Sequence, residues 1–97
     1  MKYKEIEKKS TKYAMNLANG YDKNYYNKIY NEYLIKEINK CLDNNNLIDI
    51  NEKELVNLVN IYKEVDKDNY LSFVDYIIKH SRRRLDYTKV IELLINS

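Results

Sequence analysis

The chain lacks proline and tryptophan and contains a single glycine among its 97 residues. Sheet proteins rely on glycine and proline in their hairpins and tight turns, because those turns need positive or fixed φ angles. A chain almost without both residues therefore has to consist mainly of helices. We predict an all-α fold, and the length fits one helical domain covering residues 1–97.

Cysteine and histidine are also scarce, since Cys41 and His80 are the only ones. One cysteine cannot form a disulfide within the chain, which favours a reducing, cytoplasmic location. A zinc site needs several such ligands, and Ser81 beside His80 on a helix would not face it as a catalytic partner. Because a phosphate-binding glycine loop is missing as well, we expect no enzymatic activity, no metal and no cofactor.

Long apolar runs are absent from the sequence. None approaches the roughly 20 residues that a membrane-spanning helix needs. The basic N-terminal segment has no apolar core, so it does not read as a signal peptide. We therefore expect no membrane partner.

What the chain does contain is dominated by four residue types. Asn (14), Lys (14), Ile (11) and Tyr (11) make up half of it, whereas Gly, Ala, Pro and Arg, whose codons are G/C-rich, supply only six residues. This bias indicates an A/T-rich genome, such as that of a low-GC bacterium or its phages. The abundance of tyrosine and asparagine can then reflect coding bias rather than chemistry.

Apolar residues recur at helical spacing in five segments. These segments are residues 2–18, 23–42, 52–65 and 70–83, and a short one that starts near residue 87. Short connections favour antiparallel neighbours, so we predict a compact bundle of four main helices plus a short C-terminal fifth helix. In the first segment, Tyr3, Ile6, Tyr13 and Leu17 are expected on the buried face, with Ser10 interrupting it.

Several helix boundaries carry a recognisable local signal. Asn19-Gly20 is typical of a left-handed helix C-terminus, and Asp22 is placed to cap the next helix. Asn51 and Glu54 have the spacing of a capping box, in which each side chain bonds to the other residue's backbone N–H. For the fifth helix, Asp86 or Thr88 is the expected cap.

Two acidic loops have oxygen-bearing side chains at the spacing of an EF-hand calcium loop, over residues 41–52 and 64–75. Both lack the glycine of that motif, and Cys41 stands where the first oxygen ligand belongs. Loops rich in Asx residues also form turns without any metal. A calcium-responsive protein therefore remains an alternative to the main interpretation.

A basic cluster lies near the end of the chain and includes every arginine. Its candidate binding residues are Lys79, His80, Arg82, Arg83 and Arg84. Basic residues complement the dipole at a helix end, but arginine also binds carboxylates and phosphates in a forked geometry. We predict a protein partner for this cluster. The alternative is a nucleic acid held by the cluster together with the lysines of the first helix.

A run of tyrosines marks the second helix. Tyr26, Tyr30 and Tyr33 share one side at helical spacing and are expected in the core, whereas Tyr21 and Tyr25 point elsewhere. Exposed tyrosines bury a large area in an interface at low entropic cost. We therefore add Tyr21 and Tyr25 to the candidate partner-binding residues.

Together these features favour a small, non-catalytic, intracellular protein-interaction module that binds and modulates another macromolecule. A phage or mobile-element inhibitor or adaptor fits this class. Nucleic-acid binding and calcium response remain as alternatives. A homo-oligomer is also possible, in which the first helix completes the bundle of a second copy.

Overall fold

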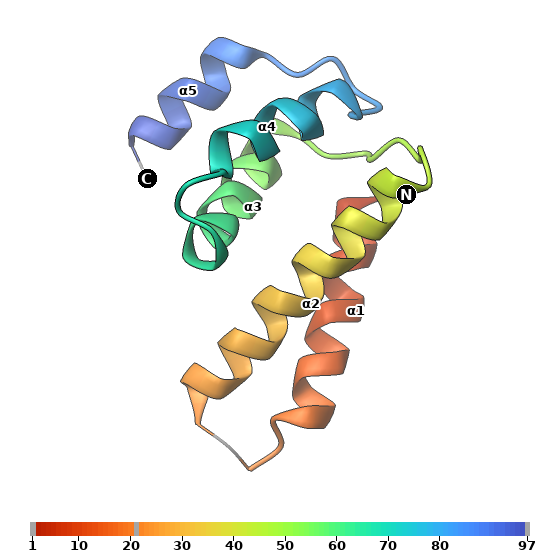
Figure 1. The fold of residues 1–97 in the computed structure, drawn as a ribbon, viewed down its shortest axis with the longest axis vertical. Coiled ribbons are helices and arrows are strands. Elements are labelled where there is room, and N and C mark those ends of the chain that lie inside the picture. The colour runs from red at the N-terminus through yellow and green to blue at the C-terminus, as the bar shows by residue number, and fades with distance from the viewer. Residues whose placement is uncertain (1, 21, 97) are drawn as a thin grey trace.

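The computed structural model describes residues 2–20 and 22–96, which form five helices and no strand (Figure 1). The helices are α1 (Tyr3–Leu17), α2 (Lys23–Asp43), α3 (Glu52–Val65), α4 (Tyr70–Lys79) and α5 (Tyr87–Ile95). The all-α prediction, with four main helices and a short fifth, is confirmed. None of the described helices has both the length and the apolar character needed to span a bilayer.

The helices are arranged as a long hairpin with three helices packed at one of its ends. α1 and α2 run antiparallel, and α3, α4 and α5 gather near the start of α1 and the end of α2 (Figure 1). The opposite end of the hairpin, around the α1–α2 turn, extends away from the other helices. The molecule is accordingly longer than it is wide, with extents of 41 × 29 × 21 Å.

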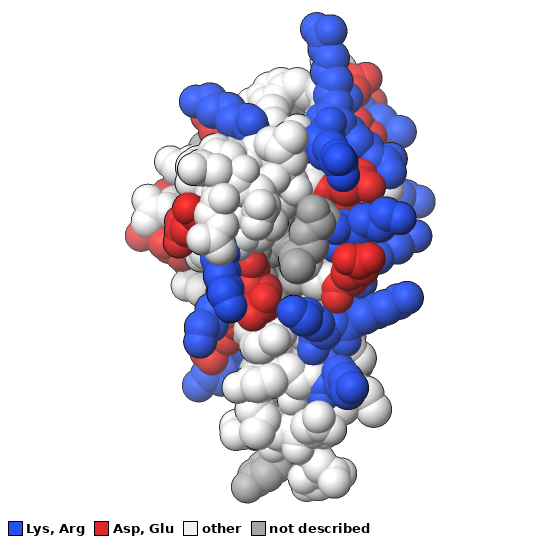
Figure 2. All heavy atoms as spheres, turned by 90° about the vertical axis from the view of Figure 1, so that its right-hand side faces the viewer, with Lys and Arg blue, Asp and Glu red and all other residues white. Residues whose placement is uncertain are grey.

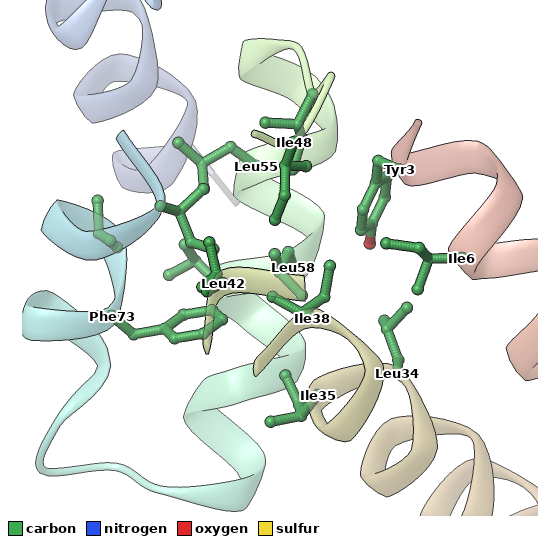
Figure 3. Close-up of a cluster of buried hydrophobic side chains, with 14 of the residues drawn as sticks. Tyr3, Ile6, Leu34, Ile35, Ile38, Leu42, Ile48, Leu55, Leu58 and Phe73 are labelled. Atoms are coloured by element: carbon green, nitrogen blue, oxygen red, sulfur yellow. The ribbon is translucent and has the colours of Figure 1, made fainter. Parts of the chain in front are cut away.

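One hydrophobic cluster joins the hairpin to the other helices (Figure 3). It includes Tyr3 and Ile6 of α1, Leu34, Ile38 and Leu42 of α2, Leu55 and Leu58 of α3, Phe73 and Ile77 of α4, and Val90 of α5. The tyrosines expected in the core lie at its margin, because Tyr26, Tyr30 and Tyr33 are only half-buried.

The predicted buried face of α1 was partly wrong. Tyr13 and Leu17 are 43% and 50% exposed, whereas Ser10 is fully buried. The Ser10 hydroxyl donates a hydrogen bond of 2.8 Å to the Ile6 carbonyl of the same helix, which satisfies the polar group inside the core. The buried stripe therefore passes from Ile6 through Ser10 to Ala14, and the helix turns Tyr13 outward.

The predicted helix boundaries are largely confirmed. Asp22 accepts a hydrogen bond of 2.9 Å from the Tyr25 backbone N–H, and Asp86 caps α5 in the same way. The capping box is present, since Asn51 and Glu54 each accept the other residue's N–H, at 2.8 and 3.0 Å. Gly20 has φ +85°, as expected for the α1–α2 turn.

A short extended segment, Ile48–Ile50, connects the two halves of the fold and was not predicted. Its backbone pairs with Lys2 and Tyr3 on one side and with residues 80–82 on the other. The Ile48 N–H donates to the His80 carbonyl at 2.9 Å, and the Arg82 N–H donates to the Ile48 carbonyl at 2.8 Å. This pairing explains why the prediction that α4 continues to Arg83 was wrong: the backbone after Lys79 bonds to Ile48 instead.

Candidate functional site

The free end of the α1–α2 hairpin exposes large apolar and aromatic side chains. We call Tyr13, Met15, Leu17 and Tyr25 the hairpin end. Met15 is 61% exposed and Leu17 50%, although both lie on a well-formed helix. Because no other helix packs against this part of the hairpin, its apolar groups have no role in the core.

Aromatic stacking holds the hairpin together near this end. The rings of Tyr13 and Tyr33 stack across the two helices with centroids 4.2 Å apart, and Tyr26 and Tyr30 stack along α2 at 6.3 Å. Stacked tyrosines lose little further freedom on binding, because their rings are already placed. The predicted binding residue Tyr25 lies here, whereas Tyr21 falls outside the described residues.

The α1 side of the hairpin end is also free of charge, whereas Asp22 and Lys23 lie beside Tyr25 at the start of α2. Residues 13–20 include no Lys, Arg, Asp or Glu, although a third of the whole chain is charged. In the face that Figure 2 shows, the charged side chains lie in the upper and middle parts, beside a further uncharged area, and the described residues of the lowest part are uncharged. Depletion of charge with enrichment in tyrosine and methionine is the compositional signature of interface centres.

A groove runs along the exposed flank of α1 toward this end. Its volume is about 560 Å³; Lys4, Lys8, Lys12 and Met15 line it from one stripe of α1, and Tyr30 lines it from α2. The three lysines are four residues apart, so they stand one above the other on successive helical turns. The groove therefore combines a row of lysines with Met15 at one end of that row and the Tyr30 ring on α2.

A half-buried carboxylate, Glu7, also lines this groove. Burial raises the pKa of Glu7, and the negative charge of Glu54 raises it further. The Tyr30 hydroxyl donates a hydrogen bond to Glu7, and burial raises the pKa of Tyr30 to about 12. Nearby, the Tyr3 ring is buried in the core, where its hydroxyl finds no hydrogen-bond partner among the described residues (Figure 3).

The arginine cluster lies beyond α4 and is divided between structural and exposed roles. Arg83 forms an ion pair with Asp49, with Nε 2.5 Å from Oδ1. The hydrogen bond from Arg83, followed by the charges of Arg83, Lys2 and Arg82, holds the pKa of Asp49 below its usual value. The Asp49 carboxylate therefore lies near basic residues from the start of α1 and from the α4–α5 connection.

The other residues of the basic cluster have different surroundings. The His80 ring packs on the Tyr76 ring with centroids 4.5 Å apart, and its Nδ1 lies 2.9 Å from the Tyr76 carbonyl oxygen. Lys79 ends α4 and is exposed, and Arg84 is exposed in the connection that follows. His80 thus has clear contacts within the fold, whereas Lys79 and Arg84 point to solvent.

Carboxylates of the two acidic loops accept hydrogen bonds from other groups of the chain. Asp66 accepts hydrogen bonds from the Asp68 N–H and from the Asn69 side-chain amide, and Glu52 accepts one from the Asp86 N–H. Within residues 2–20 and 22–96, no three His, Cys, Asp or Glu side chains gather as metal ligands. These contacts are those of Asx turns and connections between segments.

The structure does not bring the two sets of predicted binding residues together. Tyr25 lies at the free end of the hairpin, whereas residues 79–84 lie toward the other end of the molecule (Figure 1). Sequence reasoning missed the exposure of Met15 and Leu17. The signal that marks them is the uncharged stretch over residues 13–20.

Comparison of the chain with protein-family models, curated proteins and solved structures finds no match.

Proposed function

We propose that this protein is a non-catalytic, intracellular interaction module that binds a protein partner through the hairpin end. The observation that supports this most directly is the exposure of Met15 and Leu17 on an uncharged helix end that takes no part in the core. Isolated apolar residues are common on protein surfaces, but several of them on one uncharged helix end, here on both flanks of α1, are typical of a binding site.

The arrangement also suits binding energetically. Stacking of Tyr13 on Tyr33 fixes part of the surface before a partner arrives, which lowers the entropic cost of association. The hairpin end stands clear of α3, α4 and α5, so a partner can contact both helices at once. Binding there would modulate the partner by covering a surface, as an inhibitor or adaptor does.

The test is an affinity pull-down from a low-GC bacterial lysate treated with nuclease, read by mass spectrometry. The test variant is Met15→Ser with Leu17→Ser, which removes apolar area without touching the core. The matched control is Leu71→Ser, because Leu71 is 63% exposed on α4, away from the hairpin. Thermal unfolding of each variant verifies that the fold is retained.

We expect one protein retained at stoichiometric level by the unaltered chain and by Leu71→Ser, and at least about tenfold less by the double variant. Equal retention by all three would refute binding at the hairpin end. Material that disappears with nuclease would make the protein a nucleic-acid binder instead. Sedimentation at several concentrations separates a further outcome, in which the hairpin end binds a second copy of this chain.

A further inference from the structure

The groove along α1 and the hairpin end share one residue. Met15 belongs to both, since it lines the groove and is the most exposed residue of the hairpin end. A partner segment that covers Met15 and continues toward the start of α1 must therefore enter the groove. It would pass Lys12 first, then Lys8 and then Lys4.

The spacing of these lysines defines what fits beside them. Each is separated from the next by four residues, which is about 6 Å along the axis and slightly more than one helical turn. Carboxylates at every fourth position of a partner helix have the same repeat, so a helix lying along α1 can place one opposite each lysine. Met15 and Tyr30 also line the groove, and they call for apolar residues next to those carboxylates.

A second hollow continues the basic surface beyond Lys4. It has a volume of about 210 Å³ and is lined by Lys2, Lys4 and Arg83 together with three acceptor residues, Asp49, Asn51 and Glu54. Figure 2 shows that Lys and Arg predominate along one side of the molecule, with Asp and Glu interspersed among them. Lys2 and Lys4 thus extend the row of α1 lysines toward the start of the helix, beside three acceptor side chains.

This mixture favours an acidic peptide over a nucleic acid. Glu7 lies within the groove and Asp49 and Glu54 line its continuation; a phosphate backbone carries a charge at every nucleotide and would be repelled there, whereas a peptide can place uncharged side chains beside them. The net charge of the chain is only +2, whereas nucleic-acid binding domains usually present a dominant positive field. A helix with carboxylates on one edge and apolar residues beside them can pair with the three lysines and also contact Met15 and Tyr30.

We propose that the groove along α1 receives an acidic, amphipathic helical segment of the partner, with carboxylates facing Lys4, Lys8 and Lys12. This proposal rests on the proposed protein-binding function and specifies the chemistry of the partner at that surface. The three lysines align the segment along α1 and speed its association. Met15 and Tyr30 supply the apolar contact.

The test uses a fluorescein-labelled helical peptide of about 16 residues, with three Glu four positions apart and Leu beside them. A matched peptide has Gln in place of each Glu, and a single-stranded RNA of similar length serves as the competing ligand. Binding to the full chain is measured by fluorescence anisotropy at low and moderate salt. The test variant is Lys8→Glu with Lys12→Glu, and the control is Lys53→Glu with Lys67→Glu, which makes the same charge change at exposed positions elsewhere.

We expect the Glu peptide to bind at least about tenfold more tightly than the Gln peptide at low salt, with the difference shrinking as salt rises. The groove variant should weaken the Glu peptide by about tenfold or more, and the control by less than about twofold. Equal binding of both peptides, or equal effects of the two variants, would overturn the proposal. Tighter binding of the RNA, lost in the groove variant, would overturn it in favour of a nucleic acid.

These results are independent of the pull-down. The unaltered chain can retain a protein in the pull-down that the Met15→Ser, Leu17→Ser variant does not retain, while the Glu and Gln peptides bind equally. In that case the groove proposal is refuted and the proposed function stands. If the double serine variant captures its target unchanged, the proposed function fails, whatever the peptide does.

Discussion

Tyr3 provides the most direct test of the packing described above. Its side chain is 1% exposed, and its hydroxyl finds no hydrogen-bond partner within residues 2–20 and 22–96. A buried polar group without a partner costs about 1–3 kcal/mol relative to its hydrated state. Tyr3→Phe removes that group and keeps the ring. We therefore expect the variant to be more stable than the unaltered chain at pH 7, by about 1 kcal/mol after allowing for lost contacts around the oxygen.

The change with pH in the stability difference between Tyr3→Phe and the unaltered chain gives a second, independent test. Burial, with the nearby charge of Glu7, raises the pKa of Tyr3 far above its ordinary value near 10. A group with a raised folded-state pKa contributes its full stability below the unfolded pKa and loses it as the pH rises toward the folded pKa. At pH 11, above the unfolded pKa, the unaltered chain should thus have lost somewhat more than about 1 kcal/mol through Tyr3 alone.

The assay is urea unfolding of both proteins at pH 7 and pH 11, followed by circular dichroism. The advantage of Tyr3→Phe should grow from about 1 kcal/mol at pH 7 to more than 2 kcal/mol at pH 11. Tyr87→Phe is the control, because Tyr87 is 54% exposed at the start of α5. Destabilisation by Tyr3→Phe at pH 7, or a difference that does not change with pH, would refute the reasoning.

Two further predictions concern the loops that connect the helices. Asn51→Ala removes one half of the capping box, so urea unfolding should show a loss of about 1 kcal/mol, whereas Asn57→Ala within α3 should cost less. Arg83→Ala should raise the pKa of Asp49 toward its ordinary value, which nuclear magnetic resonance titration measures directly. Because the pKa of Asp49 is lowered in the fold, the ion pair stabilises the protein above about pH 4 and this contribution is lost as the pH falls. The unaltered chain and Arg83→Ala should therefore converge in stability in acid, and a constant difference down to pH 2 would contradict this assignment.

The helices and their caps could be predicted from the sequence because their causes are local. Asn51 with Glu54, and Asp22 before α2, each act within a few residues, so spacing alone identifies them. The face of α1 was harder to predict. Ser10 counts as polar in any hydrophobic pattern, but its hydroxyl bonds to Ile6 within the helix, which allows it to lie in the core.

The candidate site could not be predicted from residue spacing, because it depends on how the helices pack against one another. Met15 and Leu17 have the residue types and helical positions of core groups. Only the arrangement of the other helices at the far end of the hairpin leaves them exposed. The pairing of Ile48 with Lys2 and Ser81 was missed for a similar reason, since three short extended pieces show no strand periodicity of their own. The extended conformation shows locally in the alternation of Ile48, Asp49 and Ile50 between buried and half-exposed positions.

The Ile48–Ile50 segment also has a consequence for the order in which the chain folds. The α1–α2 turn closes over a few residues, so the hairpin can form early and locally. The pairing between Lys2 and Asp49 joins positions 47 residues apart, and that between Ile48 and Ser81 joins positions 33 apart. Such distant contacts carry a larger loop-closure entropy and form late. The hairpin end can therefore take shape before α3, α4 and α5 are fixed in place, and during synthesis the surface proposed to bind would precede the rest of the protein.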